Sequence, residues 1–175
     1  MNRAIAVALP LTVLLAGCET PPEPSSSRLA QATLRLANGL PAGTVQVLSS
    51  GDQVNVEIAL TGVSAGEHGV HLHTTGACDA PNFESAGGHL NPDGKQHGMQ
   101  NPMGAHLGDL PNVTIGSSGA GTGSAVLNGT REAVLGRLFD ADGTAIVVHA
   151  GRDDYRTDPS GNSGGRIACG VLTRI

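Results

Sequence analysis

Residues 44–60, TVQVLSSGDQVNVEIAL, contain two segments in which apolar and polar side chains alternate or nearly alternate. The segments are 44–48 and 53–60, and Ser50-Gly51-Asp52 lies between them as a turn signal. Side chains of a β-strand point alternately to its two faces, so this alternation predicts strands with one buried face. The stretch therefore predicts two short strands joined by a turn.

The same pattern extends over the rest of the chain. Further strands are expected at 29–37, 67–73, 112–115, 121–127, 144–149 and 166–173. No convincing helical pattern follows residue 28. Eight short strands with long loops at 74–111 and 150–165 predict an all-β fold, a β-sandwich or flattened barrel. Loops of this length inside a compact domain are usually functional.

Composition limits the kind of protein further. A chain of 175 residues is long enough for one domain with a real core. Aromatic residues make up only 2% and Trp is absent, so the core must consist of Val, Leu, Ile and Ala. The formal net charge of -5, with no basic stripe, argues against a nucleic-acid partner.

The N-terminus predicts an export signal and a lipid anchor. Arg3 precedes an apolar run over 4–16, which is too short to span a bilayer as a helix. The run closes in Leu15-Ala16-Gly17-Cys18, which resembles a bacterial lipoprotein box. We therefore expect a signal peptide at 1–17 and a lipidated Cys18. An ordinary cleavable signal, in which Cys18 is incidental, is the alternative.

Residues 18–27 are expected to be the lipidated cysteine and a flexible tether, because no apolar side chain follows Cys18 before residue 28. The domain at 28–175 would then be held in the bacterial cell envelope by lipid alone, on the periplasmic side or the cell surface. Such compartments are oxidising, and Cys78 and Cys169 remain as an even pair. We expect a disulfide between them, with two buried free thiols as the alternative.

Six of the seven histidines form a spaced series that indicates metal binding. His71 and His73 lie two residues apart at the end of a predicted strand, so both rings point to one face. His149 ends another predicted strand, and with His89 these residues supply four nitrogens, which suits Cu(II). Two solvated histidines would look the same as His71 and His73 alone.

A second set of metal-ligand residues lies in the long loop. His89, His97, His106 and Asp109 occupy a glycine-rich segment with too few apolar side chains to order itself by burial. Three nitrogens and one carboxylate fit tetrahedral Zn(II), which would supply that organisation. A flexible polar loop with incidental histidines is the alternative. His89 belongs naturally to both sets.

Five segments together resemble the ordered motifs of copper/zinc superoxide dismutases, and the similarity covers residues 30–175. They are GEHGVHLH at 66–73, SAGGHLNP at 85–92, HLGDLPN at 106–112, VVH at 147–149 and GRIACGV at 165–171. The resemblance implies conversion of superoxide to dioxygen and hydrogen peroxide by redox cycling of one copper per chain, with one zinc as a structural partner. It implies an eight-stranded antiparallel Greek-key sandwich or flattened barrel. It also implies copper ligands His71, His73, His89 and His149, and zinc ligands His89, His97, His106 and Asp109.

The resemblance also implies roles for residues outside the two ligand sets. Asp153 matches a carboxylate that would hydrogen-bond the outer nitrogens of His71 and His97 and so orient both sites. The alternative is that Asp153, or its neighbour Asp154, is a solvated loop acid. His68 matches a structural histidine that does not bind metal.

Arg166 is the remaining functional candidate, together with His89. The resemblance implies that Arg166 attracts and orients superoxide beside copper, while the copper side of His89 is released and protonated during the cycle. An ordinary surface arginine is the alternative. The loop at 150–165 lacks the Glu/Lys cluster of eukaryotic members, so steering is expected to depend on Arg166, Lys95 and Arg152 in another arrangement.

Two other functions remain open at this point. A copper-binding or copper-delivery module of the envelope would need the histidines, but neither Arg166 nor a bridging ligand. A redox-silent, zinc-stabilised sandwich would act as a binding protein. The complete ligand set together with Arg166 favours the enzyme. The oligomeric state does not follow from the resemblance, so a homodimer and a monomer are both open.

Overall fold

The computed structural model describes residues 26–175 as strands, loops and two short helical segments. Expected features at 1–17 and at Cys18 lie outside the described residues. The elements are β1 (Ser26–Leu36), β2 (Pro41–Ser50), β3 (Gln53–Thr61), β4 (Gly66–His68), β5 (Val70–His73), η1 (Glu84–Ala86), β6 (Val113–Ile115), β7 (Ala120–Leu127), α1 (Arg131–Leu138), β8 (Ala145–His149), β9 (Arg166–Val171) and β10 (Thr173–Arg174).

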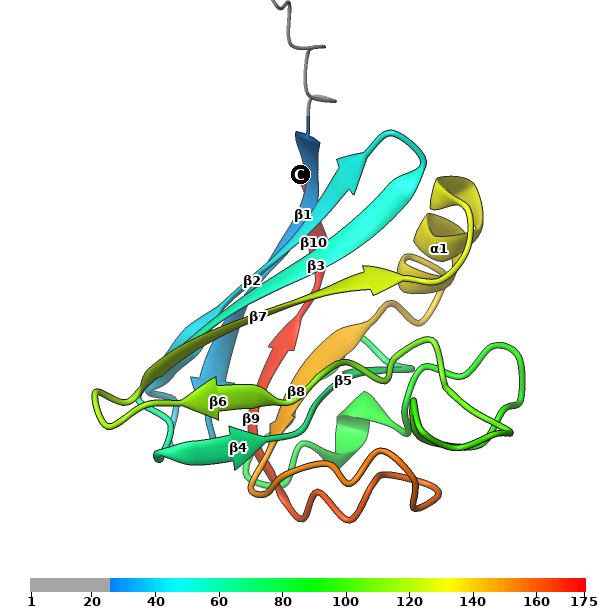
Figure 1. Ribbon diagram of the computed structural model, residues 1–175. Helices are drawn as coiled ribbons and strands as arrows, with labels where there is room; N and C mark the ends of the chain where they lie inside the picture. Colours follow the sequence, from blue (N-terminus) through cyan, green and yellow to red (C-terminus); the bar gives the residue numbers. More distant parts are fainter. Residues whose placement is uncertain (1–25) are drawn as a thin grey trace, which may run out of the picture.

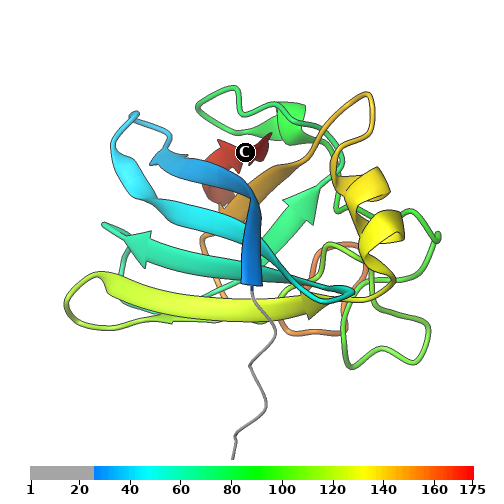
Figure 2. The same cartoon turned by 90° about the horizontal axis from the view of Figure 1, so that it is seen from above.

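All paired strands are antiparallel, and most belong to one strongly curved sheet (Figure 1). The strand order is β5-β8-β9-β1-β2-β3-β7, with β10 also pairing with β1. Strands β4 and β6 form a separate two-stranded sheet. Seen from above, the strands wrap around a central core (Figure 2). The expected all-β class, an antiparallel Greek-key sandwich or flattened barrel, is confirmed.

The hairpin of β2 and β3 shows why the alternating sequence folds in this way. The pairing runs from Gly43 opposite Leu60 to Ser50 opposite Gln53, with the expected turn between the strands. Val45 and Val47 on one strand, and Val56 and Ile58 on the other, are buried, whereas most of their sequence neighbours are exposed or half-buried. Burying each such side chain contributes about 1.5–3 kcal/mol, which fixes the face that turns to the core.

Two of the eight expected strands are each divided into two, which gives ten strands in the part of the chain that the structure describes. The strand expected at 67–73 is interrupted at Gly69, whose N–H donates to the Gly151 carbonyl and whose carbonyl accepts from the His149 N–H. Before Gly69 the chain pairs with β6, as strand β4, and after it the chain pairs with β8, as strand β5. The strand expected at 166–173 is interrupted at Leu172, whose N–H donates to the Thr144 carbonyl.

The expectation that no helix follows residue 28 is wrong, because α1 is an eight-residue helix. Its N-cap is Thr130, whose hydroxyl accepts from the Ala133 N–H, and Val134 and Leu138 are buried four residues apart. A helix this short repeats its apolar position only once, so its periodicity was too weak to recognise. No helix within residues 26–175 is long and apolar enough to cross a membrane.

The first strand begins earlier than the domain boundary expected at residue 28. Ser26 and Ser27, expected in the tether, pair with Ser50 and Ser49 at the end of β2. The hydroxyls of Ser27 and Ser49 also form a hydrogen bond of 2.8 Å. Backbone pairing therefore extends the strand beyond its apolar residues.

The expected disulfide is confirmed, and it ties a long loop to the sheet. Cys78, in the loop after β5, is bonded to Cys169 of β9, with a Cα–Cα distance of 5.7 Å. Phe83, Ala86 and Val147 are buried in the same small apolar cluster as Cys169. The loops at 74–112 and 150–165 lie at one end of the barrel (Figure 1), and this cluster holds the first of them there.

Candidate metal centre

Two adjoining strands and the first long loop bring six histidines together. His71 and His73 lie on β5, and His149 ends β8, which pairs with β5. The loop is attached to β5 by isolated β-bridges from His71 to Asp109 and from His73 to His89. Backbone pairing therefore brings residues that are far apart in the sequence to one buried place.

His71, His73, His89 and His149 are here called the four-histidine group. Each offers one ring nitrogen, and these four atoms all lie within 4.8 Å of one another. In each ring one nitrogen is buried without a hydrogen-bond partner. These atoms are His71 Nδ1, His73 Nε2, His89 Nε2 and His149 Nε2. Leaving four such atoms unpaired is costly unless a cation binds them. Four convergent imidazoles suit copper.

The opposite nitrogen of each ring is held by the protein, and this fixes which nitrogen carries the proton. His73 Nδ1 donates to the Gly87 carbonyl at 2.9 Å, and His149 Nδ1 donates to the Gly164 carbonyl at 3.1 Å. A carbonyl oxygen can only accept, so each Nε2 keeps a free lone pair. Partners of this kind orient the rings that bind a metal.

The second set, here called the Asp109 group, consists of His89, His97, His106 and Asp109. The three Nδ1 atoms lie 2.9, 3.0 and 3.1 Å from the same oxygen, Asp109 Oδ1. Donor atoms around a tetrahedral zinc ion are separated by roughly 3.3 Å, given bonds of about 2.0–2.1 Å. The second oxygen, Oδ2, accepts from the N–H groups of Gly98 and His106. The Asp109 group therefore has the composition and the spacing of a zinc site.

His89 takes part in both groups through different atoms. Its Nδ1 faces Asp109, and its Nε2 belongs to the four-histidine group. The side chain is only 4% exposed, so neither nitrogen depends on bulk water. One ring can therefore serve two metal ions.

Asp153 connects the same two groups from the second long loop. Its Oδ2 lies 2.6 Å from His71 Nε2, and its Oδ1 lies 3.0 Å from His97 Nε2. The carboxylate is fully buried. Asp154 instead accepts hydrogen bonds within its own loop, from Arg156 and Thr157. The structure thus brings Asp153, and not Asp154, to the two groups.

Burial and hydrogen bonding set the charges of these residues. Burial lowers the pKa of His71 to about 3, of His73 to about 2 and of His149 to about 4. These rings are therefore neutral at pH 7, the form that binds metal. Burial also lowers the pKa of His97, but hydrogen bonds with Asp109 and Asp153 outweigh it and raise the pKa to about 9. In the metal-free protein a proton on His97 accordingly compensates part of the carboxylate charge.

Arg166 lies at the start of β9 beside the four-histidine group. Its two terminal nitrogens donate to the carbonyls of Phe83 and Gly87, both at 2.6 Å. The Gly87 carbonyl also accepts from His73, so it joins Arg166 to a ring of the group. Gly87 has φ +76°, and a Cβ there would collide with the Thr74 hydroxyl. The sequence indicated Arg166 but not the carbonyls of Phe83 and Gly87 that hold it, because every residue type has a backbone carbonyl.

The other charged and histidine candidates lie outside the two groups. His68 is buried, with its ring nitrogens 2.7 Å from the His149 carbonyl and 3.0 Å from the Ser64 carbonyl. Arg152 is exposed and lies 3.5 Å from Glu67, which offsets its charge. Lys95 is exposed, and its backbone carbonyl, not its ammonium, meets His106 Nε2.

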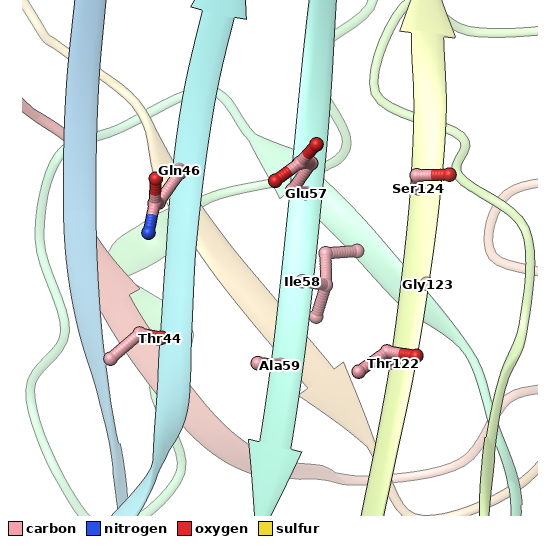
Figure 3. A pocket seen from close by; sticks show the side chains of 8 residues that line it. All are labelled: Thr44, Gln46, Glu57, Ile58, Ala59, Thr122, Gly123 and Ser124. Carbon is pink, nitrogen blue, oxygen red and sulfur yellow. The ribbon is translucent and has the colours of Figure 1, made fainter. Parts of the chain in front are cut away.

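A separate hollow lies on the outer face of β2, β3 and β7 (Figure 3). Small and polar side chains line most of it, among them Thr44, Gln46, Glu57, Thr122 and Ser124. None of the metal-group residues, nor Arg166, lines this hollow. The candidate site is therefore the buried centre and not this sheet face.

The geometry agrees with a comparison against known families. The family model described as copper/zinc superoxide dismutase matches residues 41–172, which is most of the chain. The chain belongs to the copper/zinc superoxide dismutase family. The resemblance predicted from the sequence is confirmed. This family uses copper and zinc, and the four-histidine group and the Asp109 group fit those two metals.

Relatives across several bacteria are similar over most of their length. A Cu-Zn superoxide dismutase of Deinococcus radiodurans is 36% identical, and the match covers 100% of each chain. A Cu-Zn superoxide dismutase of Aquifex aeolicus is 40% identical over 82% of this chain and 85% of its own. The crystal structure of a superoxide dismutase-like protein from Bacillus subtilis is 36% identical, covering 82% of this chain and 97% of its own, with a TM-score of 0.71.

Proposed function

We propose that this chain converts superoxide to dioxygen and hydrogen peroxide, with copper in the four-histidine group and zinc in the Asp109 group. The observation that carries the proposal is one buried ring, His89, shared between two complete donor sets with Arg166 beside them. Bound copper supplies one-electron redox chemistry, and bound zinc, which has no redox chemistry, organises its ligands. The chain's residues then have distinct tasks.

His89 would carry a proton as well as join the two sites. Its Nδ1 is held on the zinc side, so only Nε2 is available to change partner. Nε2 would take up a proton when the first superoxide is oxidised to dioxygen. It would give that proton to the second superoxide, which gains one electron and takes its other proton from solvent, so that hydrogen peroxide forms. Asp153 would keep His71 and His97 oriented throughout, because it hydrogen-bonds both rings.

Arg166 would bind and orient the anion. Its guanidinium is permanently charged, and the carbonyls of Phe83 and Gly87 hold it in one orientation. Clefts of one charge raise the rate of anion capture by about 10–10³-fold in favourable cases. Because the whole chain carries a net charge of -5, this attraction must be local.

Arg166→Ala should slow superoxide decay about 10-fold or more at low ionic strength, since the variant loses the cation that captures the anion. The dependence of the rate on ionic strength should weaken, while copper content stays unchanged. Stopped-flow decay over a range of salt concentrations measures both effects. Arg166→Lys should retain part of the salt dependence, and Arg152→Ala, which alters an exposed ion pair, is the matched control. Loss of copper or an unchanged rate in Arg166→Ala would refute the assigned role.

Metal analysis combined with a superoxide-decay assay tests the function itself. We expect one copper and one zinc per chain, rapid cyanide-sensitive decay, and a Cu(II) paramagnetic resonance spectrum with four nitrogen ligands. Copper binding without decay would favour an envelope copper-delivery module. Zinc binding without copper would favour a redox-silent binding protein. Either result would overturn the proposed activity.

We further propose that the protein is exported and anchored in the bacterial envelope by lipid on Cys18. The sequence pattern at 1–18 supports this, and the Cys78–Cys169 disulfide is compatible with an oxidising compartment. The intact mass of the protein from membrane fractions tests the anchor: an unmodified N-terminus would contradict it. Sedimentation of the purified protein distinguishes a homodimer from a monomer.

A further inference from the structure

Asn112 holds Asp153 through both atoms of its side-chain amide. Its Nδ2 donates to the Asp153 carbonyl at 2.9 Å, and its Oδ1 accepts from the Asp153 N–H at 2.8 Å. The side chain thus pairs with the Asp153 backbone much as a neighbouring strand would. Asn112 itself belongs to neither metal group.

Tyr155 completes this contact between the two long loops. Its hydroxyl accepts from the Asn112 N–H at 2.7 Å, and its own N–H donates to Asp153 Oδ1 at 2.6 Å. Its carbonyl accepts from the N–H of Gln100, in the first long loop, at 3.0 Å. Asn112, Asp153 and Tyr155, here called the loop junction, therefore fix one another at several points.

The loop junction is attached to the two-stranded sheet of β4 and β6. Asn112 immediately precedes β6, where Val113 pairs with His68 of β4. Asp153, in contrast, lies in a loop of 16 residues, 150–165, that has no strand or helix of its own. The position of its carboxylate thus depends on what holds its backbone. Because the Asp153 carboxylate hydrogen-bonds one ring of each metal group, any displacement of it would move a ligand of both groups.

We propose that Asn112 and Tyr155 are positioning residues for the metal centre and act through Asp153. Asn112 fixes the Asp153 backbone, and Tyr155 fixes Asn112 and one carboxylate oxygen. Asp153 in turn orients His71 of the four-histidine group and His97 of the Asp109 group. The proposal rests on the metal assignment given above, but its readout is metal affinity and not dismutation, so the two can fail separately.

Asn112→Ala should lower the affinities for copper and for zinc together, each by about 10–100-fold, the usual cost of losing a partner that orients ligands. Competition with chromophoric chelators measures each metal separately in the full chain. Asn162→Gly is the matched control, because Asn162 bonds only Asp154 and Thr157 in the same loop and has a φ of +52° that glycine accepts. Its affinities should stay within about 2-fold of the parent protein. Equal losses in both variants would show general loosening of the loop and would overturn the proposal.

Two further variants separate positioning from a purely structural effect. In an Asp153→Ala background, Asn112→Ala should cause no further loss of metal affinity, because the residue through which it acts is gone. Tyr155→Phe, which removes one hydroxyl, should weaken both metals in the same direction by roughly 2- to 10-fold. Additive losses in the double variant would overturn the proposal even if Asn112→Ala proved poorly folded. If Tyr155→Phe binds both metals as tightly as the parent protein, Tyr155 is not a positioning residue.

Discussion

Replacing His89 with alanine should reduce superoxide decay by more than about 100-fold and weaken the binding of both metals. Losing a partner that only orients a ligand costs about 10–100-fold, and His89 is itself a proposed ligand in both groups. Without its ring, each group retains three protein donors, and the proton carrier at Nε2 is lost as well. No other residue in the part of the chain described belongs to both groups.

The measurement is metal content and metal affinity of the purified variant, together with its decay rate. His106→Ala is the matched control, because His106 belongs only to the Asp109 group. That variant should lose zinc affinity while retaining copper with four nitrogens in its paramagnetic resonance spectrum. If His89→Ala affected one metal only, the shared ring would not bridge the two sites.

Removing the disulfide with Cys78→Ser and Cys169→Ser should lower the free energy of unfolding of the metal-free protein by about 4.5 kcal/mol in the chain-entropy model. The bond closes a large loop, since the two residues are separated by 91 positions. The disulfide also holds the loop segment in which the carbonyls of Phe83 and Gly87 accept hydrogen bonds from Arg166. Activity should therefore fall even under conditions in which the variant remains folded.

Chemical denaturation followed by far-UV circular dichroism measures this loss of stability. Cys18→Ser is the control, since Cys18 is not a partner in the bond, and it should leave unfolding of the domain unchanged. Either single substitution should cost nearly as much as the double one, because each breaks the same bond. A loss below about 1 kcal/mol would mean that the rest of the fold already restricts this loop.

How much of the fold was predictable depended on the length of each pattern. The strands around residues 44–60 alternate over enough residues to reveal the buried face and the turn. Helix α1 has only Val134 and Leu138 as a buried pair on its regular spacing, so helix and loop could not be distinguished. The division at Gly69 could not be predicted either, because it follows from hydrogen bonds to residues about 80 positions away.

The candidate site was predictable where chemistry depends on residue type. Imidazole and carboxylate side chains at characteristic spacings indicated both metal groups before any geometry was known. Apart from Asp153, the sequence did not indicate the groups that hold these side chains in place. Gly87 and Gly164 contribute backbone carbonyls, which carry no signature of residue type. In the sequence, Asn112 cannot be distinguished from other loop asparagines, because only the structure shows its hydrogen bonds to Asp153.

The chain has no tryptophan and a single tyrosine, and that tyrosine is in the loop junction. Near-ultraviolet absorption and emission therefore report almost entirely on one contact between two loops and very little on the barrel. Local opening and global unfolding have different free energies in most proteins. A tyrosine signal lost before the far-ultraviolet signal would record the loops separating from an intact sheet. The molecule thus contains its own optical probe for closure of the metal centre.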